Sequence, residues 1–242
     1  TNVQTTNPQI STLRWAAGND LNFFLNGAED TGEDIVDGPA DGNLIDADKA
    51  LLGVGPKGGL GSSGWDGDIA EVILYNSSIN TASLQIVHNY LSSRYGIALP
   101  AGQDVFDHDA TFDKNIAGIG RVDANNFHTD AKGISRVRIF NPTGLDDGDF
   151  LLWGHDNASF TTEETDVPSS IDNRLNRVWR VTETNEVGDV NFSIDLSGFD
   201  INDGSDIRLL VDRDGNGNFD DIPTGNIINE ARNSTPKGKG KA

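Results

Sequence analysis

The chain has 242 residues, 36% of them hydrophobic, which is enough to form one or two cores. Its formal net charge of -20 disfavours nucleic acid and anionic membranes as partners and attracts divalent cations. Cysteine and methionine are both absent, which excludes disulfides, cysteine nucleophiles and thiolate metal sites, and we expect a segment of a longer protein. No apolar run is long enough to span a bilayer, so no membrane insertion is expected.

The composition favours an all-β fold, because 28 glycines accompany short apolar runs with little helical periodicity. The first strands are expected at residues 10–16 and 20–25. Residues 27–65 follow as a loop-rich stretch, first acidic and then rich in glycine. The acidic part indicates either a solvated loop or a calcium site at the rim of a sandwich. The glycines lack the Gly-Lys-Ser/Thr ending of a phosphate loop and favour a tight β-connection.

Residues 68–75 (DIAEVILY) are apolar on both faces, with Glu71 as the single charge in the middle. This pattern predicts a strand buried in a sheet or sandwich. Glu71 is expected either to make a hydrogen bond at the sheet edge or to contact a ligand. Trp65, which opens the strand, is either a core residue or an aromatic platform for a sugar.

One helix is expected directly after this strand. Asn80 or Thr81 is a suitable N-cap, and Gly96 supplies the left-handed stop. Between them, one apolar stripe follows the helical spacing, formed by Leu84, Val87 and Leu91 with Ile86 and Tyr90 beside it.

The strand GDIAEVILYN and the helix end NYLSSRYGI together resemble the C-terminal end of a laminin-G-like, concanavalin-A-like jelly-roll domain. The sequence LNFFLNG at residues 21–27 is similar to a strand and turn of that family. The resemblance implies a jelly-roll fold and a secreted or bacterial cell-surface setting. A complete jelly roll needs more strands than residues 1–99 hold, so we expect either truncation or strands supplied by a neighbouring chain.

Residues 100–113 are interpreted as a linker, and short strands with turns then predict a second β-sandwich over residues 114–230. Its strands are expected at residues 115–122, 134–141, 150–155, 175–184, 190–196 and 207–212. The runs IAGIGR, GDFLLWGHD, NRLNRVWRVTE and VGDVNFSIDLS resemble an uncharacterised domain that follows such jelly rolls in bacterial adhesins. That resemblance implies no catalytic residues. Residues 231–242 are expected to be a flexible basic tail.

The sharpest local motif is DRDGNGNFDD at residues 212–221. Oxygen-bearing side chains at alternate positions, with glycines that permit a tight wrap, are typical of calcium loops. The residue expected at the end of an EF-hand loop is replaced by Pro223, so a shorter calcium turn or a plain Asp/Asn/Gly hairpin turn remain the alternatives. The candidate ligands are Asp212, Asp214, Asn216, Asn218, Asp220 and Asp221.

Catalysis is not expected. Asp30 and Glu33 give only a fragment of the carboxylate pattern of retaining β-glucanases, and neither a histidine cluster nor a serine-hydrolase elbow is present. His155 is expected to make a hydrogen bond at a strand end, and Trp153 and Trp179 are expected in the core. The arginines of the NRLNRVWR run are expected to pair with acidic residues.

The sequence thus predicts a partial jelly roll with one helix (1–99), a linker, a second β-sandwich and a tail. The predicted function is non-catalytic binding or adhesion at the bacterial surface, stabilised by calcium, with a glycan or surface polymer as ligand. The alternative is a structural subunit of an extracellular filament or sheath, assembled as a homo-polymer or with neighbouring domains by strand pairing between chains.

Overall fold

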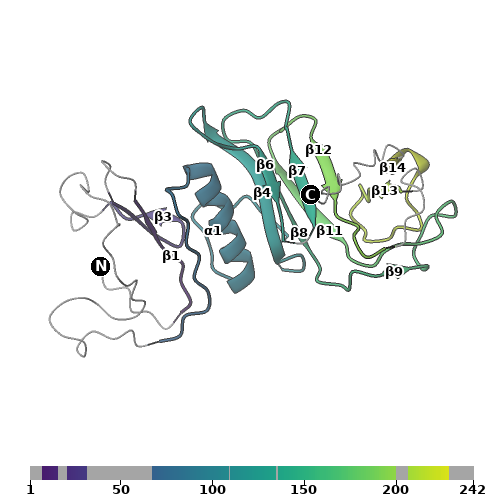
Figure 1. The fold of residues 1–242 in the computed structure, drawn as a ribbon, viewed down its shortest axis with the longest axis horizontal. Helices are drawn as coiled ribbons and strands as arrows, with labels where there is room; N and C mark the ends of the chain where they lie inside the picture. Colours follow the sequence, from purple (N-terminus) through teal and green to yellow (C-terminus); the bar gives the residue numbers. More distant parts are fainter. Residues whose placement is uncertain are drawn as a thin grey trace, which may run out of the picture.

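The computed structural model describes residues 7–15, 21–31, 67–108, 110–134, 136–199 and 207–228. These residues form an all-β protein of several antiparallel sheets with a single α-helix, as predicted. Figure 1 shows the layers in order: a small N-terminal sheet, the helix α1, and two larger sheets face to face.

The helix α1 (Thr81–Tyr95) confirms the predicted bounds. The side chain of Asn80 accepts a hydrogen bond from the backbone N–H of Ser83 at 2.9 Å, and Gly96 has the left-handed φ of 65°. The predicted apolar stripe is buried only in part, since Leu84 and Ile86 are buried whereas Val87, Tyr90 and Leu91 are half-buried. The helix lies between two sheets and buries several polar side chains as well. Its buried residues are Ala82, Leu84, Gln85, Ile86, His88, Asn89, Ser92 and Ser93.

The N-terminal sheet covers one side of α1. It consists of β1 (Ser11–Arg14), β2 (Asn22–Leu25) and β3 (Ala28–Glu29), all antiparallel. His88 of the helix lies 3.0 Å from the hydroxyl of Thr12 and contacts the ring of Phe24. Burial, and next the charge of Arg14, lower the pKa of His88 to about 4. A neutral histidine therefore joins the helix to this sheet.

The central sheet lies on the other side of α1, with strand order β11-β8-β4-β5. Its strands are β4 (Lys114–Asp123), β5 (Asn126–His128), β8 (Phe150–His155) and β11 (Trp179–Thr184). The side chains of β8 alternate between two cores: Phe150 and Leu152 join the cluster under the helix, whereas Leu151 and Trp153 face the next sheet. A Cβ at Gly120 of β4 would lie 2.1 Å from the Phe150 ring, so the strand needs glycine here.

The outer sheet completes a β-sandwich with the central one. It contains β12 (Asn191–Ile194), β7 (Val137–Phe140) and β6 (Asp130–Lys132), in that order. Trp153 is 0% exposed between the two sheets, which confirms its predicted place in the core, whereas Trp179 is only half-buried. Two short ladders lie at the far end, β9 (Thr162–Glu163) with β10 (Arg174–Leu175) and β13 (Leu209–Leu210) with β14 (Ile227–Ile228), the latter following the 3-10 turn η3 (Thr224–Asn226).

The segment predicted as a linker, residues 100–113, contributes two residues to the core. Val105 and Phe106 are buried in the same cluster as Ala82 of the helix. Asn89 fixes the segment, since its side chain accepts the backbone N–H of Val105 and donates to the carbonyl of Gln103. The helix thus packs with the second sandwich and is not separated from it by a free connection.

The prediction of a buried strand at residues 68–75 is wrong. The segment is extended, but it belongs to no ladder, and its large apolar side chains are between 37% and 81% exposed. The physical reason is that no strand among the described residues lies beside it to pair with its backbone. The strand predicted at residues 207–212 is also shorter than expected and contains only β13.

Candidate functional site

Three features of the described residues are candidates for a functional site: the exposed segment 68–75, the Asp212 loop (residues 212–221) and a shallow depression beside Phe160. Within the described ranges, no group of three or more His, Cys, Asp or Glu side chains is arranged to hold a metal ion. No described helix is both long and apolar enough to cross a membrane.

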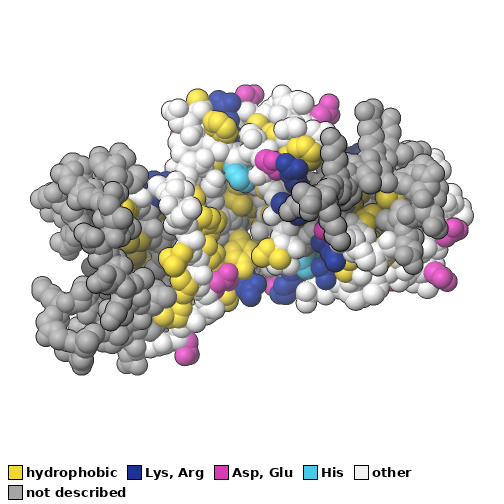
Figure 2. Space-filling view, viewed as in Figure 1, with side chains coloured by type: hydrophobic (Ala, Val, Ile, Leu, Met, Phe, Trp, Pro, Cys, Tyr) yellow, Lys and Arg dark blue, Asp and Glu magenta, His cyan; other side chains and the backbone are white. Residues whose placement is uncertain are grey.

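The exposed segment 68–75 brings several exposed large apolar side chains together on the described surface. Figure 2 shows hydrophobic side chains in a band beside α1, where Figure 1 places the chain that enters this helix. Its exposed large apolar residues are Ile69, Val72, Ile73, Leu74 and Tyr75. Within the part of the chain that the structure describes, no strand ladder or turn satisfies the backbone N–H and C=O groups of this segment. Exposed apolar patches and unpaired extended backbone both mark interaction sites.

Glu71 holds the exposed segment against the helix. Its carboxylate accepts hydrogen bonds from the hydroxyls of Tyr90 at 3.0 Å and Tyr95 at 2.8 Å, and it lies 3.3 Å from the guanidinium of Arg94. Burial, and then the hydrogen bond to Glu71, raise the pKa of Tyr90. Glu71 therefore anchors the segment to α1, and its carboxylate is engaged by the protein itself rather than presented to a ligand.

The Asp212 loop is wound around its own carboxylates. Asp212 accepts the backbone N–H groups of Gly215 at 2.8 Å and Gly217 at 2.9 Å, and both glycines have positive φ. Burial opposes the charged form of Asp212, yet the bonds from Gly217 and Gly215 outweigh it and hold the pKa of its carboxyl below the usual value. The sequence motif therefore forms the tight wrap that its glycines predicted.

Two further carboxylates of the loop, those of Asp214 and Asp221, both accept hydrogen bonds from the side-chain amide of Asn216. The side-chain nitrogen of Asn216 donates to Asp214 at 3.2 Å and to Asp221 at 3.0 Å. The backbone N–H of Asn218 donates to the Asn216 side-chain oxygen, and that of Asp220 is bound by Asp166 from outside the loop. Of the six predicted ligands, the loop therefore brings Asp214, Asn216 and Asp221 together.

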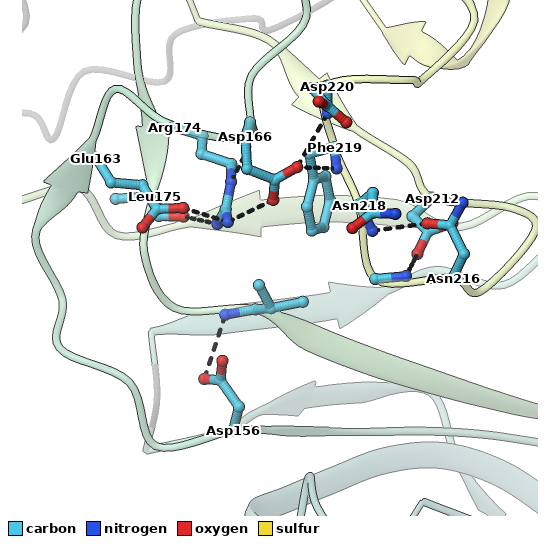
Figure 3. A network of polar contacts seen from close by, with 12 residues as sticks. Asp156, Glu163, Asp166, Arg174, Leu175, Asp212, Asn216, Asn218, Phe219 and Asp220 are labelled. Atoms are coloured by element: carbon cyan, nitrogen blue, oxygen red, sulfur yellow. Dashed lines mark hydrogen bonds and ion pairs between the residues drawn. The ribbon is translucent and has the colours of Figure 1, made fainter.

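Asp166 joins this loop to the arm formed by β9 and β10. Its carboxylate accepts the backbone N–H groups of Phe219 at 2.6 Å and Asp220 at 3.1 Å. Burial opposes the charge on Asp166, but these two bonds and Arg174 outweigh it, so its pKa lies below the usual value. Figure 3 shows Arg174 between Glu163 and Asp166, with ion pairs to both, and its guanidinium lies over the Phe219 ring at 4.7 Å.

The oxygen atoms of the Asp212 loop are of the kind that calcium binds, but their arrangement fits a calcium site only in part. Carboxylate and amide oxygens are the ligands that calcium prefers, and the Asn216 amide nitrogen lies where two carboxylates converge. Arg180 opposes a cation here, because it donates to the carbonyl of Gly215 and lies 3.8 Å from the carboxylate of Asp212. The residues that would hold the ion are Asp214, Asn216 and Asp221.

An open depression of about 370 Å³ lies beside Phe160. Aromatic rings and hydroxyls line it, among them Phe199 and Ser197. The Phe160 ring is already covered by the guanidinium of Arg136 at 4.3 Å, and Phe199 lies at its edge. A sugar would have to displace the arginine to stack on this ring.

Other predicted residues lie apart from these features. Trp65 and Glu33 lie outside the described residues, and Asp30 follows β3 at the N-terminal sheet. His155 ends β8, where its Nδ1 accepts the backbone N–H of Asn157 at 2.9 Å and its Nε2 contacts the Asn115 amide.

The sequence analysis missed Asp166 and the tyrosine pair of α1. Asp166 contacts residues more than fifty positions away, a separation that leaves no local pattern. A signal existed for the tyrosines, since Tyr90 and Tyr95 stand on the helix directly after a strand with one central carboxylate. The arginine run was predicted to pair with acids, and Arg174 and Arg180 do so.

Comparisons with known proteins identify a family but no function. A family model described as a domain of unknown function (DUF8202) matches residues 83–238, well over half of the chain. The match begins inside α1, which agrees with the packing of this helix against the central sheet. No curated protein and no solved structure matches the chain.

Proposed function

The chain belongs to this family of domains of unknown function, and we propose that it is a non-catalytic binding and assembly segment of a large secreted or surface-attached bacterial protein. The observation that carries the proposal is the exposed segment 68–75, which combines large apolar side chains with a backbone that pairs with no strand of the described residues. Another extended strand would satisfy a row of backbone N–H and C=O groups and at the same time cover apolar side chains.

Strand pairing between chains is the mode of binding that the described geometry favours. A glycan or surface polymer is the second candidate ligand, implied by the resemblance to surface adhesins, and the depression beside Phe160 is its candidate place. In that depression the guanidinium of Arg136 lies over the Phe160 ring, where a sugar would stack. The exposed segment needs no such rearrangement, since Glu71 and the helix already hold it extended.

The strand-pairing proposal is tested by amide hydrogen exchange on the full chain. The probe is a synthetic peptide with the sequence of residues 67–76. We expect it to slow exchange at residues 69–75 by about tenfold or more at saturation, because pairing protects amides that are open in the free chain. The matched control is the same peptide with proline in place of Val72, which removes a donor and blocks pairing. Equal exchange with and without the first peptide would contradict the proposal.

Calcium is proposed to stabilise the Asp212 loop by bringing Asp214, Asn216 and Asp221 around one ion. Binding to the folded chain alone raises its stability by about 1.4 kcal/mol at ten times the dissociation constant. The test compares the urea midpoint in calcium with that in chelator. Asp214→Asn should abolish the difference, whereas Asp189→Asn, an exposed aspartate away from the loop, should keep it. No shift in the unaltered chain would contradict the calcium proposal.

A further inference from the structure

The exposed segment 68–75 has a sequence that is complementary to itself. We propose that its occupant is the same segment of a second copy, paired antiparallel about a two-fold axis at Val72. This inference rests on the proposed strand-pairing function and goes further, because it names the partner and the register. Its basis is the order of the side chains along a backbone that, within the described ranges, pairs with no strand.

A two-fold axis at Val72 gives apolar cross-strand pairs at the two ends of the segment. Ile69 then lies opposite Tyr75 of the other copy, and Ala70 lies opposite Leu74. Aromatic and branched aliphatic side chains in direct opposition are among the stabilising pairs of antiparallel sheets. All four of these flanking positions are exposed in the single chain, so each pair removes apolar surface from water.

Charge selects this register over its neighbour. With the axis at Val72, each Glu71 lies opposite Ile73, and its carboxylate keeps its bonds to Tyr90 and Tyr95 of its own helix. An axis at Glu71 would instead place the two carboxylates directly opposite each other, which is destabilising. An axis at Ala70 or Ile73 leaves a shorter overlap of the apolar run.

The contacts of Glu71 also determine which side chains of the two-stranded sheet face the helices. Glu71 contacts α1, so it lies on the helix side of the extended segment, and Val72 and Leu74 point to the other side. A two-fold axis perpendicular to the sheet pairs like faces, so both helices lie on one side and Val72 and Leu74 meet on the other. Every copy contributes the same surface, and the assembly closes as a dimer.

The net charge of -20 opposes the approach of two copies and makes the association dependent on salt. The Debye length falls from about 14 Å to about 4 Å between about 0.05 M and about 0.5 M ionic strength. We therefore expect the dimer fraction in sedimentation velocity to rise with NaCl over this range. If the segment instead paired with a basic strand of another protein, salt would weaken that complex rather than strengthen it.

The deciding experiment uses the absence of cysteine from the chain. A single cysteine is introduced in two variants, Val72→Cys and Leu74→Cys, and disulfide dimers are measured after mild oxidation. Residues directly opposite each other have Cα atoms about 5 Å apart, within reach of a disulfide. The two copies of residue 74 would instead be about 14 Å apart, because each lies opposite residue 70.

We expect Val72→Cys to form the disulfide dimer at least about tenfold faster than Leu74→Cys, although Leu74 is the more exposed residue (81% against 46%). Equal rates in the two variants, or faster reaction of Leu74→Cys, would overturn the register. A chain that stays monomeric at high salt would overturn the second copy as occupant. If the peptide of residues 67–76 still protects the segment in either case, strand pairing stands and only this inference fails.

Discussion

Strand β8 and the exposed segment 68–75 are both apolar on two faces, and their environments are opposite. Every residue of β8 is buried, with α1 on one side and the outer sheet on the other. The segment 68–75 has α1 on one side through Glu71, and its large apolar side chains are exposed. A pattern of apolar residues thus shows that a segment can be buried on both faces. Whether it is buried depends on which other elements pack against it.

The two stretches also differ in how polar groups hold them. The backbone of β8 is paired on both edges, with β4 and with β11, so its polar groups are satisfied by sheet hydrogen bonds. The segment 68–75 is held on the helix by the polar contacts of Glu71. The difference predicts that changes in β8 alter global stability, and that changes in the segment alter local order and association.

The largest expected contrast comes from a matched pair of leucines. Leu152 in β8 is 0% exposed and Leu74 is 81% exposed. Leu152→Ala should lower the free energy of unfolding by about 3 kcal/mol, because it removes buried surface and leaves a cavity. Leu74→Ala should change it by less than about 0.5 kcal/mol at low protein concentration. Urea unfolding followed by circular dichroism checks both, and similar losses would show that the segment is buried in solution.

Acid should weaken the β8 region through His155. Burial, followed by the charge of Arg177, lowers the pKa of this ring to about 4 from 6.5 in the unfolded chain. Between these values the unfolded chain binds a proton that the folded chain does not. The stabilisation is therefore complete above about pH 6.5 and decreases toward pH 4, by about 3 kcal/mol for this ring.

The hydrogen bond at His155 also favours the neutral ring. Its Nδ1 accepts the Asn157 N–H, so a proton there breaks a bond that the neutral ring makes. Urea midpoints measured from pH 7 to pH 4 should fall, and His155→Gln should reduce the slope while lowering stability at neutral pH. His88 adds a similar contribution at the helix, so the slope should not vanish in the variant. A ring titration of His155 near 6.5 by NMR would contradict this account.

The elements that were predicted from sequence are those with local signals. The helix was predicted to its ends because Asn80 and Gly96 carry capping chemistry that acts within one turn. β8 and the buried Trp153 were predicted because a continuous apolar run in a β-rich sequence has few alternatives. The turn-forming character of the Asp212 loop was equally local, since its glycines and carboxylates lie within ten residues.

The features that sequence could not supply depend on distant neighbours. Val105 and Phe106 were assigned to a linker because proline and glycine precede them, and their burial against Ala82 appears only in the folded chain. The contact between Asp166 and Phe219, shown in Figure 3, likewise joins residues that are 53 positions apart in the sequence. The exposure of residues 68–75 is the same kind of result, since their pattern describes a strand without specifying its neighbours.

The smallest expected effect tests the polar anchor itself. Glu71→Gln removes the charge that pairs with Arg94 while keeping an oxygen that Tyr90 and Tyr95 can bond. Because the anchor is at the surface, we expect about 1 kcal/mol or less in global stability. The local consequence is larger: the protection of residues 69–75 by the peptide of residues 67–76 should weaken, because the segment leaves α1 more often and is less often held in place for pairing.

The titration of Tyr90 gives this last prediction a second readout. Its pKa is raised by burial and by the negative charge of Glu71, so Glu71→Gln should move the phenol toward its ordinary pKa near 10. Ultraviolet absorbance between pH 8 and pH 12 measures the change, and Glu186→Gln, an exposed carboxylate beyond β11, is the control. An unchanged Tyr90 titration would mean that Glu71 does not contact the helix in solution. The segment would then lack the fixed, extended backbone on which strand pairing depends.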